Sequence, residues 1–221
     1  MRATSFTKTK FNIRFDRVYS SNKSKRKWYF AEMPGDHSFI DNEDKLTARR
    51  DNIDKFIDFF EHILEISMMV TIDTLSVPIP TRVIESSQFS YFLDQKKSHD
   101  FSKICLELTN SFDEDKINKN CIKQLKRLKE QGCQISLKSY DCNSWLSLPT
   151  LFKLHLIDYL NVSVHILTHS RTYQLLIDKL VTYLSKNKIE IIAKEIHTPV
   201  DFVTAMNHKF KYLQGEFIKK L

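Results

Sequence analysis

The chain has 221 residues, 42% of them hydrophobic and 28% charged, a composition typical of a folded globular protein. It carries a net charge of +7 and only three glycines, which excludes the glycine-rich loops that cradle phosphates in nucleotide-binding folds. No apolar run is long enough to cross a membrane, and the first ten residues lack the apolar core of a secretion signal. We therefore expect one cytoplasmic domain over residues 1–221, with residues 1–10 as a basic N-terminal segment and no membrane contact.

The first elements form a predicted β-hairpin. Residues 11–19 and 28–33 are rich in strand formers, and the polar segment 20–27 between them reads as a turn. Residues 1–30 hold nine basic residues and one acidic residue, a local charge of +8. The turn carries four of these basic residues: Lys23, Lys25, Arg26 and Lys27. They form either a patch that binds a partner or polyanion, or a solvated turn without such a role.

Helical and strand patterns then alternate along the chain. The later strands are expected at 68–75, 103–108, 133–138, 157–162, 189–194 and 211–215. Helices are expected at 43–66, 80–94, 165–186 and 198–208, with a loop or short helix over 141–155. A further helix follows residue 110, where Ser111 and Glu114 form a capping box, and it ends at Gly132.

This alternation indicates βαβ units and a parallel sheet. Seven or eight strands in about 220 residues fit a closed (β/α) barrel, and an open doubly wound sheet is the alternative. In such barrels the functional side chains lie at the C-terminal ends of the strands. Those ends give six candidate site residues: Asp73, Glu107, Lys138, Asn161, Lys194 and Gln214.

The order of the segments ICLELT, LKRLKEQGCQISLKSYD, LIDYLNVS, IEIIAKEIHT and KYLQGEF resembles that of the EAL-domain family of cyclic di-GMP phosphodiesterases and their degenerate relatives. The resemblance covers about residues 11–217 and is strongest from Ile104 to Phe217. It implies an EAL-type, TIM-barrel-like (β/α) barrel preceded by an N-terminal β-hairpin.

The family motifs are carried over position by position. The glutamate of the E-A-L signature falls on Ala31 or, with a shift of one residue, on Glu32, and the arginine after the signature falls on Gly35. The asparagine of N-L-S aligns with Asp73 and the glutamate of E-L-T-E with Glu107.

The C-terminal motifs depart further from the family pattern. The D-D-F-G stretch begins at Lys138, and the lysine and aspartate of K-I-D fall on Asn161 and Ser163. The E-G-V-E-T motif begins at Lys194 and keeps only Thr198, with His197 in place of its second glutamate. The Q-G pair survives as Gln214-Gly215.

These departures predict a loss of catalysis. The family's reaction uses two divalent cations, and hard cations need several oxygen ligands. Two positions that the resemblance makes metal ligands carry lysine, which has donors only, and at about 4 Å in a partly dry site each such charge costs about 4 kcal/mol of repulsion per unit of cation charge. The four cysteines and eight histidines show no spacing typical of another metal site. We therefore expect no catalytic residues, no metal and no cofactor.

Three functions compete at this point. The first is a non-catalytic regulator that works by protein contact; the resemblance implies a transcription regulator of motility, fimbriae or virulence as the partner. The second is a receptor that binds cyclic di-GMP without cleaving it, and the third is nucleic-acid binding through residues 1–30. We favour the first and expect neither cyclic di-GMP nor nucleic acid to bind. A structural role is the competing interpretation of Glu107, which we expect to pair with Lys138 on the next strand.

Overall fold

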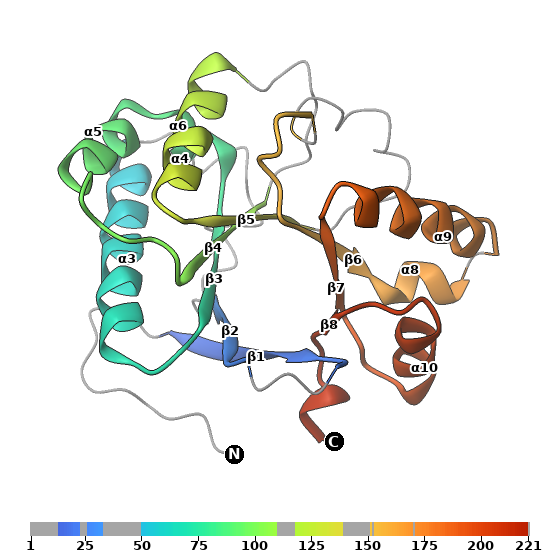
Figure 1. Ribbon diagram of the computed structural model, residues 1–221. Helices are drawn as coiled ribbons and strands as arrows, with labels where there is room; N and C mark the ends of the chain where they lie inside the picture. The colour runs from blue at the N-terminus through green and yellow to red at the C-terminus, as the bar shows by residue number, and fades with distance from the viewer. Residues whose placement is uncertain are drawn as a thin grey trace.

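Eight strands close into a barrel in chain order in this computed structural model, which describes residues 13–22, 26–32, 50–109, 118–138, 151, 153–169 and 171–220 (Figure 1). The strands are β1 (Arg14–Ser20), β2 (Trp28–Glu32), β3 (Thr74–Ile79), β4 (Ile104–Leu108), β5 (Gln134–Leu137), β6 (Tyr159–Ser163), β7 (Glu190–Lys194) and β8 (Tyr212–Leu213). Strand β1 runs antiparallel to both β2 and β8, and all other neighbours are parallel. The predicted barrel and hairpin are confirmed.

Helices surround the barrel in two groups (Figure 1). One group comprises α3 (Arg50–Met69), α4 (Thr81–Glu85), α5 (Ser87–Gln95) and α6 (Lys119–Glu130). The other comprises α8 (Val164–His169), α9 (Arg171–Lys186) and α10 (Pro199–Asn207), and the short 3-10 helix η3 (Ile218–Lys220) ends the described chain. No described helix is both long and apolar enough to span a bilayer.

Two helix predictions miss local breaks. The pattern over 80–94 is divided at Ser86, which ends α4 and caps α5 by accepting a hydrogen bond from the Phe89 backbone N–H at 3.1 Å. The pattern over 165–186 is likewise divided between α8 and α9. A polar residue inside a continuous apolar stripe caps a new helix without changing the stripe's period, so periodicity alone does not reveal the break.

Two other element boundaries also differ. The strand expected at 68–75 starts only at Thr74, because Met68 and Met69 finish α3. Helix α6 begins at Lys119, where the Asn118 side chain accepts from the Cys121 backbone N–H. The predicted capping box of Ser111 and Glu114 lies outside the described residues.

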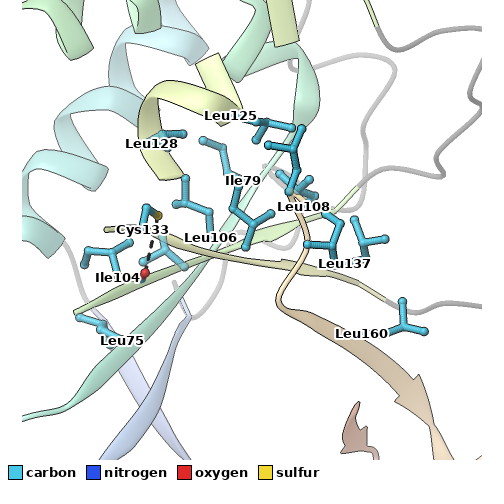
Figure 2. Packing of buried hydrophobic residues seen from close by; sticks show 14 of the residues in the cluster. Leu75, Ile79, Ile104, Leu106, Leu108, Leu125, Leu128, Cys133, Leu137 and Leu160 are labelled. Atoms are coloured by element: carbon cyan, nitrogen blue, oxygen red, sulfur yellow. Dashed lines mark hydrogen bonds between the residues drawn. The ribbon is translucent and has the colours of Figure 1, made fainter. Parts of the chain in front are cut away.

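The main hydrophobic core fills the space between the strands and the helices. Figure 2 shows a part of it in which Leu106 and Leu108 from β4 face Leu125 and Leu128 from α6. These residues are fully buried, and burying a leucine contributes about 1.5–3 kcal/mol. The outward-facing residues of each strand therefore bind the helical layer to the barrel.

A second, smaller core lies inside the barrel, made of Val18, Trp28, Cys105, Tyr159, Ile192 and Tyr212. The Trp28 ring meets the rings of Tyr159 and Tyr212 edge-on, at centroid distances of 4.7 and 4.8 Å. Its indole N–H donates to the Ser76 hydroxyl at 2.7 Å. Burial raises the pKa of the Cys105 thiol to about 12, so this cysteine stays a neutral packing group.

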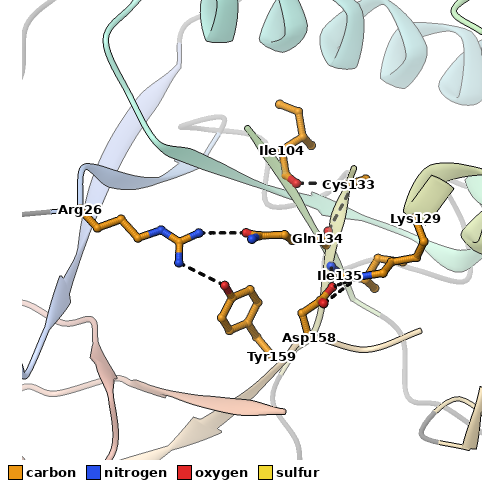
Figure 3. Close-up of polar contacts among 8 residues, drawn as sticks. All are labelled: Arg26, Ile104, Lys129, Cys133, Gln134, Ile135, Asp158 and Tyr159. Carbon is orange, nitrogen blue, oxygen red and sulfur yellow. Dashed lines mark hydrogen bonds and ion pairs between the residues drawn. The ribbon is translucent and has the colours of Figure 1, made fainter. Parts of the chain in front are cut away.

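Arg26 closes the N-terminal end of the barrel. Its guanidinium donates to the Tyr159 hydroxyl and to the Gln134 amide oxygen, at 3.2 and 3.0 Å (Figure 3). It donates as well to the hydroxyls of Tyr212 and Thr74, at 3.1 and 2.6 Å. It also lies 4.7 Å from the centroid of the Trp28 ring. The prediction that Arg26 belongs to a solvent-facing basic patch is therefore wrong, because five donors in one planar fork satisfy polar groups on four strands.

The rest of the expected patch is only partly described. Lys27 is exposed and its backbone N–H donates to Asp73, while Lys23 and Lys25 lie outside the described residues. On the same side of the barrel, Asp158 accepts from the Lys129 ammonium and from the Ile135 backbone N–H (Figure 3). This end of the barrel is thus joined by polar contacts that hold the strands in register.

Candidate functional site

Five of the six predicted site residues lie on, or directly after, the consecutive strands β4 to β8. Lys138 follows β5 and Gln214 follows β8, while Glu107, Asn161 and Lys194 lie on β4, β6 and β7. Successive strand residues point to opposite faces, and the interior positions Cys105, Tyr159 and Ile192 are each two residues before Glu107, Asn161 and Lys194. These three side chains therefore face the barrel interior, one step closer to the mouth than the inner core.

Glu107 is the centre of this group. Its side chain is only 2% exposed, and its Oε2 accepts two hydrogen bonds: from the Lys194 ammonium at 2.5 Å and from the Asn161 amide at 2.7 Å. Lys194 is 16% exposed, so the ion pair extends from the buried carboxylate toward the open end of the barrel. A charge-assisted contact of this length is among the strong hydrogen bonds of proteins.

The expected pairing of Glu107 with Lys138 is wrong. The structure gives Glu107 two partners, Lys194 and Asn161, although β5 is the strand next to β4. Lys138 is half-buried, and its backbone N–H donates to the Leu108 carbonyl. Inside a closed barrel, an inward-facing side chain of a distant strand can contact Glu107 as readily as one of the neighbouring strand. The order of the strands in the sequence does not reveal this.

Two apolar residues missed by the sequence analysis complete the surroundings of this pair. Lys194 Nζ lies 4.3 Å from the centroid of the Phe30 ring, a cation–π contact that fixes the ammonium from the β2 side. Pro78 pairs in register with Glu107 from β3, and proline offers neither a side-chain ligand nor a backbone N–H. The sequence did contain a signal for Pro78. It follows Ser76 by two residues, so the two side chains lie on the same face of the strand.

Asp73 is not part of this site. It precedes β3, and its carboxylate accepts from the Lys27 backbone N–H at 2.7 Å, at the N-terminal end of the barrel. Asp73 was expected at the C-terminal end of a strand because that strand was predicted to cover residues 68–75. With β3 running from Thr74 to Ile79, the position beside Glu107 is Pro78.

Ala31 is also excluded from the interior. It is fully buried in the outer core with Phe56, Phe59 and Phe60 of α3, so it points away from the barrel axis. The alternation along β2 gives the inward positions to Trp28 and Phe30. Ala31, one of the two positions considered for the signature glutamate, therefore does not line the interior, and the Glu32 side chain and Gly35 lie outside what the structure describes.

The connection after β7 has an unusual backbone. Glu195 has a positive φ of 61°, a conformation that costs a non-glycine residue about 1 kcal/mol or more. Its carboxylate accepts a short hydrogen bond from the Ser163 hydroxyl at the end of β6. A second carboxylate therefore lies at the mouth, held by Ser163, at a position that the sequence analysis did not single out.

The remaining motif residues have structural roles. Thr198 caps α10 in a capping box with Asp201, and the exposed His197 contributes only its backbone N–H to that carboxylate. Gly215 lies so close to Ile196 that a Cβ would be 2.3 Å from the Ile196 carbonyl oxygen. The Gln214-Gly215 pair thus lets two backbone segments touch where the barrel closes.

The family's divalent cations do not fit the residues at this mouth. Magnesium and calcium need about six or more oxygen ligands, most of them anionic or carbonyl. Beside Glu107 the described chain places a lysine ammonium, which repels a cation, together with the Asn161 amide, an aromatic ring and a proline. No group of three or more His, Cys, Asp or Glu side chains arranged to hold a metal occurs among the described residues.

Comparison with known structures shows the same fold in proteins of low sequence identity. The EAL-domain protein YkuI of Bacillus subtilis, solved with substrate cyclic di-GMP and calcium, matches with a TM-score of 0.70 at 12% identity, over 93% of this chain and 53% of that one. This chain thus spans about half the length of YkuI.

Two further matches are the EAL domain of FimX from Xanthomonas citri and LapD of Vibrio cholerae, both solved with cyclic di-GMP. For FimX the TM-score is 0.70 at 14% identity, over 94% of this chain and 86% of that one. For LapD it is 0.69 at 15% identity, over 94% and 53%. No curated protein matches the chain significantly.

These complexes overturn one expectation from the sequence. The missing ligands were taken to argue against cyclic di-GMP binding, yet structures with this fold, including YkuI and FimX, hold that ligand. The expectation is therefore wrong as a conclusion from the sequence. The family model for the EAL domain matches residues 53–220, which is most of the chain, so the chain belongs to the EAL-domain family.

Proposed function

We propose that this EAL domain is a regulator that binds cyclic di-GMP without hydrolysing it. The observation that carries the proposal is the state of Glu107, whose Oε2 is occupied by the Lys194 ammonium and the Asn161 amide. The Lys194 ammonium beside this carboxylate repels a divalent cation, so Glu107 is poorly suited to hold a cation and its activated water. The fold around it matches that of YkuI and FimX, which were solved with cyclic di-GMP.

The charges at the mouth support a ligand with phosphates. Lys194 is partly exposed there at the end of β7, and Lys138 is half-buried at the end of β5, on the other side of β6. Lysine ammonium groups bind phosphate oxygens through strong charge-assisted hydrogen bonds. A cyclic dinucleotide with two phosphodiesters matches this chemistry better than a neutral metabolite.

Binding is tested by titrating the full chain with cyclic di-GMP in a calorimeter, with cyclic di-AMP as a matched dinucleotide of the same charge. We expect saturable binding of cyclic di-GMP and recovery of the intact nucleotide when the protein is removed. Absence of any binding heat at protein concentrations of about 100 µM contradicts the proposal.

We further propose that the output of the domain is contact with a protein, specifically a transcription regulator. A domain without turnover acts only through what it touches, and α10 presents Val200, Val203 and Met206, which are 65%, 55% and 41% exposed. These residues recur every three positions and so lie along one side of the helix. Large exposed apolar patches mark interaction sites.

The partner is tested by affinity capture with the wild type, Val203→Asp and the control Lys123→Glu on α6, a substitution of an exposed residue on another helix. A DNA-binding regulator captured by the wild type and the control and lost with Val203→Asp supports the proposal. Capture of the same regulator by all three proteins contradicts the role of α10.

A further inference from the structure

We infer that the Lys194 ammonium serves as a cation built into the chain, so that the mouth binds the phosphate of cyclic di-GMP without any divalent metal ion. The inference rests on the proposed function and adds to it how the charge of the ligand is met. It follows from the misfit between divalent cations and the residues around Glu107.

The ammonium is fixed by two contacts. Glu107 Oε2 lies 2.5 Å from Lys194 Nζ, and the Phe30 ring centroid lies 4.3 Å from it. Glu107 is itself oriented by Asn161, which donates to the same Oε2. A long flexible side chain is thus held in one place, which lowers the entropy lost when a ligand binds.

The ammonium also has unused binding capacity. Lysine carries three N–H donors, and Glu107 takes one of them. The side chain keeps 16% of its exposure, while Glu107 below it keeps 2%, so the accessible part of the ion pair is its positive end. An approaching phosphate therefore meets a donor, and the carboxylate lies behind it.

The other charged groups facing the mouth allow this geometry. Lys138, half-buried at the end of β5, adds a second ammonium. Glu195 adds a carboxylate, which already accepts from the Ser163 hydroxyl. A phosphate oxygen that approaches the end of β7 thus meets the Lys194 ammonium, and the charge of Lys138 adds to the positive charge of the mouth.

A competing arrangement is a cation held by buried oxygens that have no hydrogen-bond partner. Glu107 Oε1, Asn161 Oδ1 and Gln214 Oε1 are buried and have no hydrogen-bond partner in the described part of the chain. These atoms are all acceptors and include one carboxylate oxygen. A divalent ion there would lie close to the Lys194 ammonium, which repels it. Binding of the nucleotide that depends on such an ion would overturn the inference.

The experiment is a calorimetric titration with cyclic di-GMP in EDTA and, separately, in millimolar calcium chloride. Wild-type protein is expected to bind with the same dissociation constant, within twofold, in both buffers. Binding that requires calcium overturns the inference and leaves the proposed function standing. No binding in either buffer overturns both.

Three variants locate the contact. Lys194→Met is expected to weaken binding at least tenfold in EDTA, whereas the exposed control Lys123→Met on α6 leaves the constant unchanged. Because Lys194→Met leaves Glu107 unpaired and buried, the double variant Lys194→Met with Glu107→Gln, which removes both charges, is measured beside it. Wild-type affinity in the folded double variant, with its melting transition intact, shows that Lys194 does not hold the phosphate.

Discussion

Lys194 lies on β7 and Glu107 on β4, yet the ammonium of one is 2.5 Å from the carboxylate of the other inside the closed barrel. Removing one partner from a buried pair costs about 3–5 kcal/mol, since the other charge is left uncompensated. We therefore expect Lys194→Met to lower the free energy of unfolding by roughly 3 kcal/mol.

A double-mutant cycle measures this coupling by urea unfolding. The variant Lys194→Met with Glu107→Gln is expected to recover much of the loss, because neither charge remains buried. Losses that add in the double variant would show that the two side chains do not stabilise each other.

Arg26 is expected to be the most sensitive basic residue of the hairpin. Arg26→Met removes donors to Thr74, Gln134, Tyr159 and Tyr212 and leaves polar groups unsatisfied inside the barrel. We expect a loss of about 2–3 kcal/mol. Lys27→Met, at the exposed neighbouring position, should change the stability by less than about 0.5 kcal/mol. Equal effects of the two substitutions would show that Arg26 does not close the barrel.

Gly132 and Gly215, which both have a positive φ, are expected to differ in their tolerance of alanine. A Cβ at Gly215 would lie 2.3 Å from the Ile196 carbonyl oxygen, and one at Gly132 would lie 3.3 Å from Ser102. Gly132→Ala should cost about 1 kcal/mol through its backbone conformation. Gly215→Ala forces two backbone segments apart and should cost roughly 3 kcal/mol or more. Thermal unfolding of both variants checks the order, and the reverse order contradicts the close approach at Gly215.

Asp201 is expected to make the stability depend on pH in the acid range. Burial tends to raise its pKa, but hydrogen bonds from Thr198 and from the backbone N–H of His197 and Thr198 outweigh this and lower it from the usual 3.8. A carboxyl with a lowered folded pKa stabilises the protein above its unfolded pKa and loses that contribution as the pH falls through the folded value.

The corresponding measurement is the urea midpoint of the wild type and of Asp201→Asn between pH 7 and pH 2. The difference between them, about 1 kcal/mol at neutral pH, should shrink below pH 3.8. A difference that stays constant across this range would show that the charge of Asp201 does not contribute to the cap of α10.

The barrel was predictable from the sequence because its signal is repeated. From Ile104 onward, each apolar strand precedes or follows a helix with clear periodicity. The assignment of each strand is therefore supported by the assignment of the helix beside it. Asp73 and Ala31 were misplaced where the signal was weak. For Asp73, the strand β3 begins six residues later than expected. For Ala31, a shift of one residue along β2 turns the side chain from the interior to the outer core.

The partners of the site were beyond sequence reasoning for a different reason. Glu107, Asn161 and Lys194 were identified, but which lysine reaches Glu107 depends on the diameter and tilt of the closed barrel. The place of Arg26 was hidden in the same way, because a polar turn next to a barrel end is indistinguishable in sequence from a polar turn in solvent.

The measurement that tests the account most directly is turnover of cyclic di-GMP by the full chain with excess manganese, followed by chromatography of the nucleotides. With Glu107 held by Lys194, we predict that the cyclic nucleotide is recovered intact, at the level of a protein-free control, after many hours. Formation of the linear dinucleotide by the wild type, abolished by Glu107→Gln, would contradict the account.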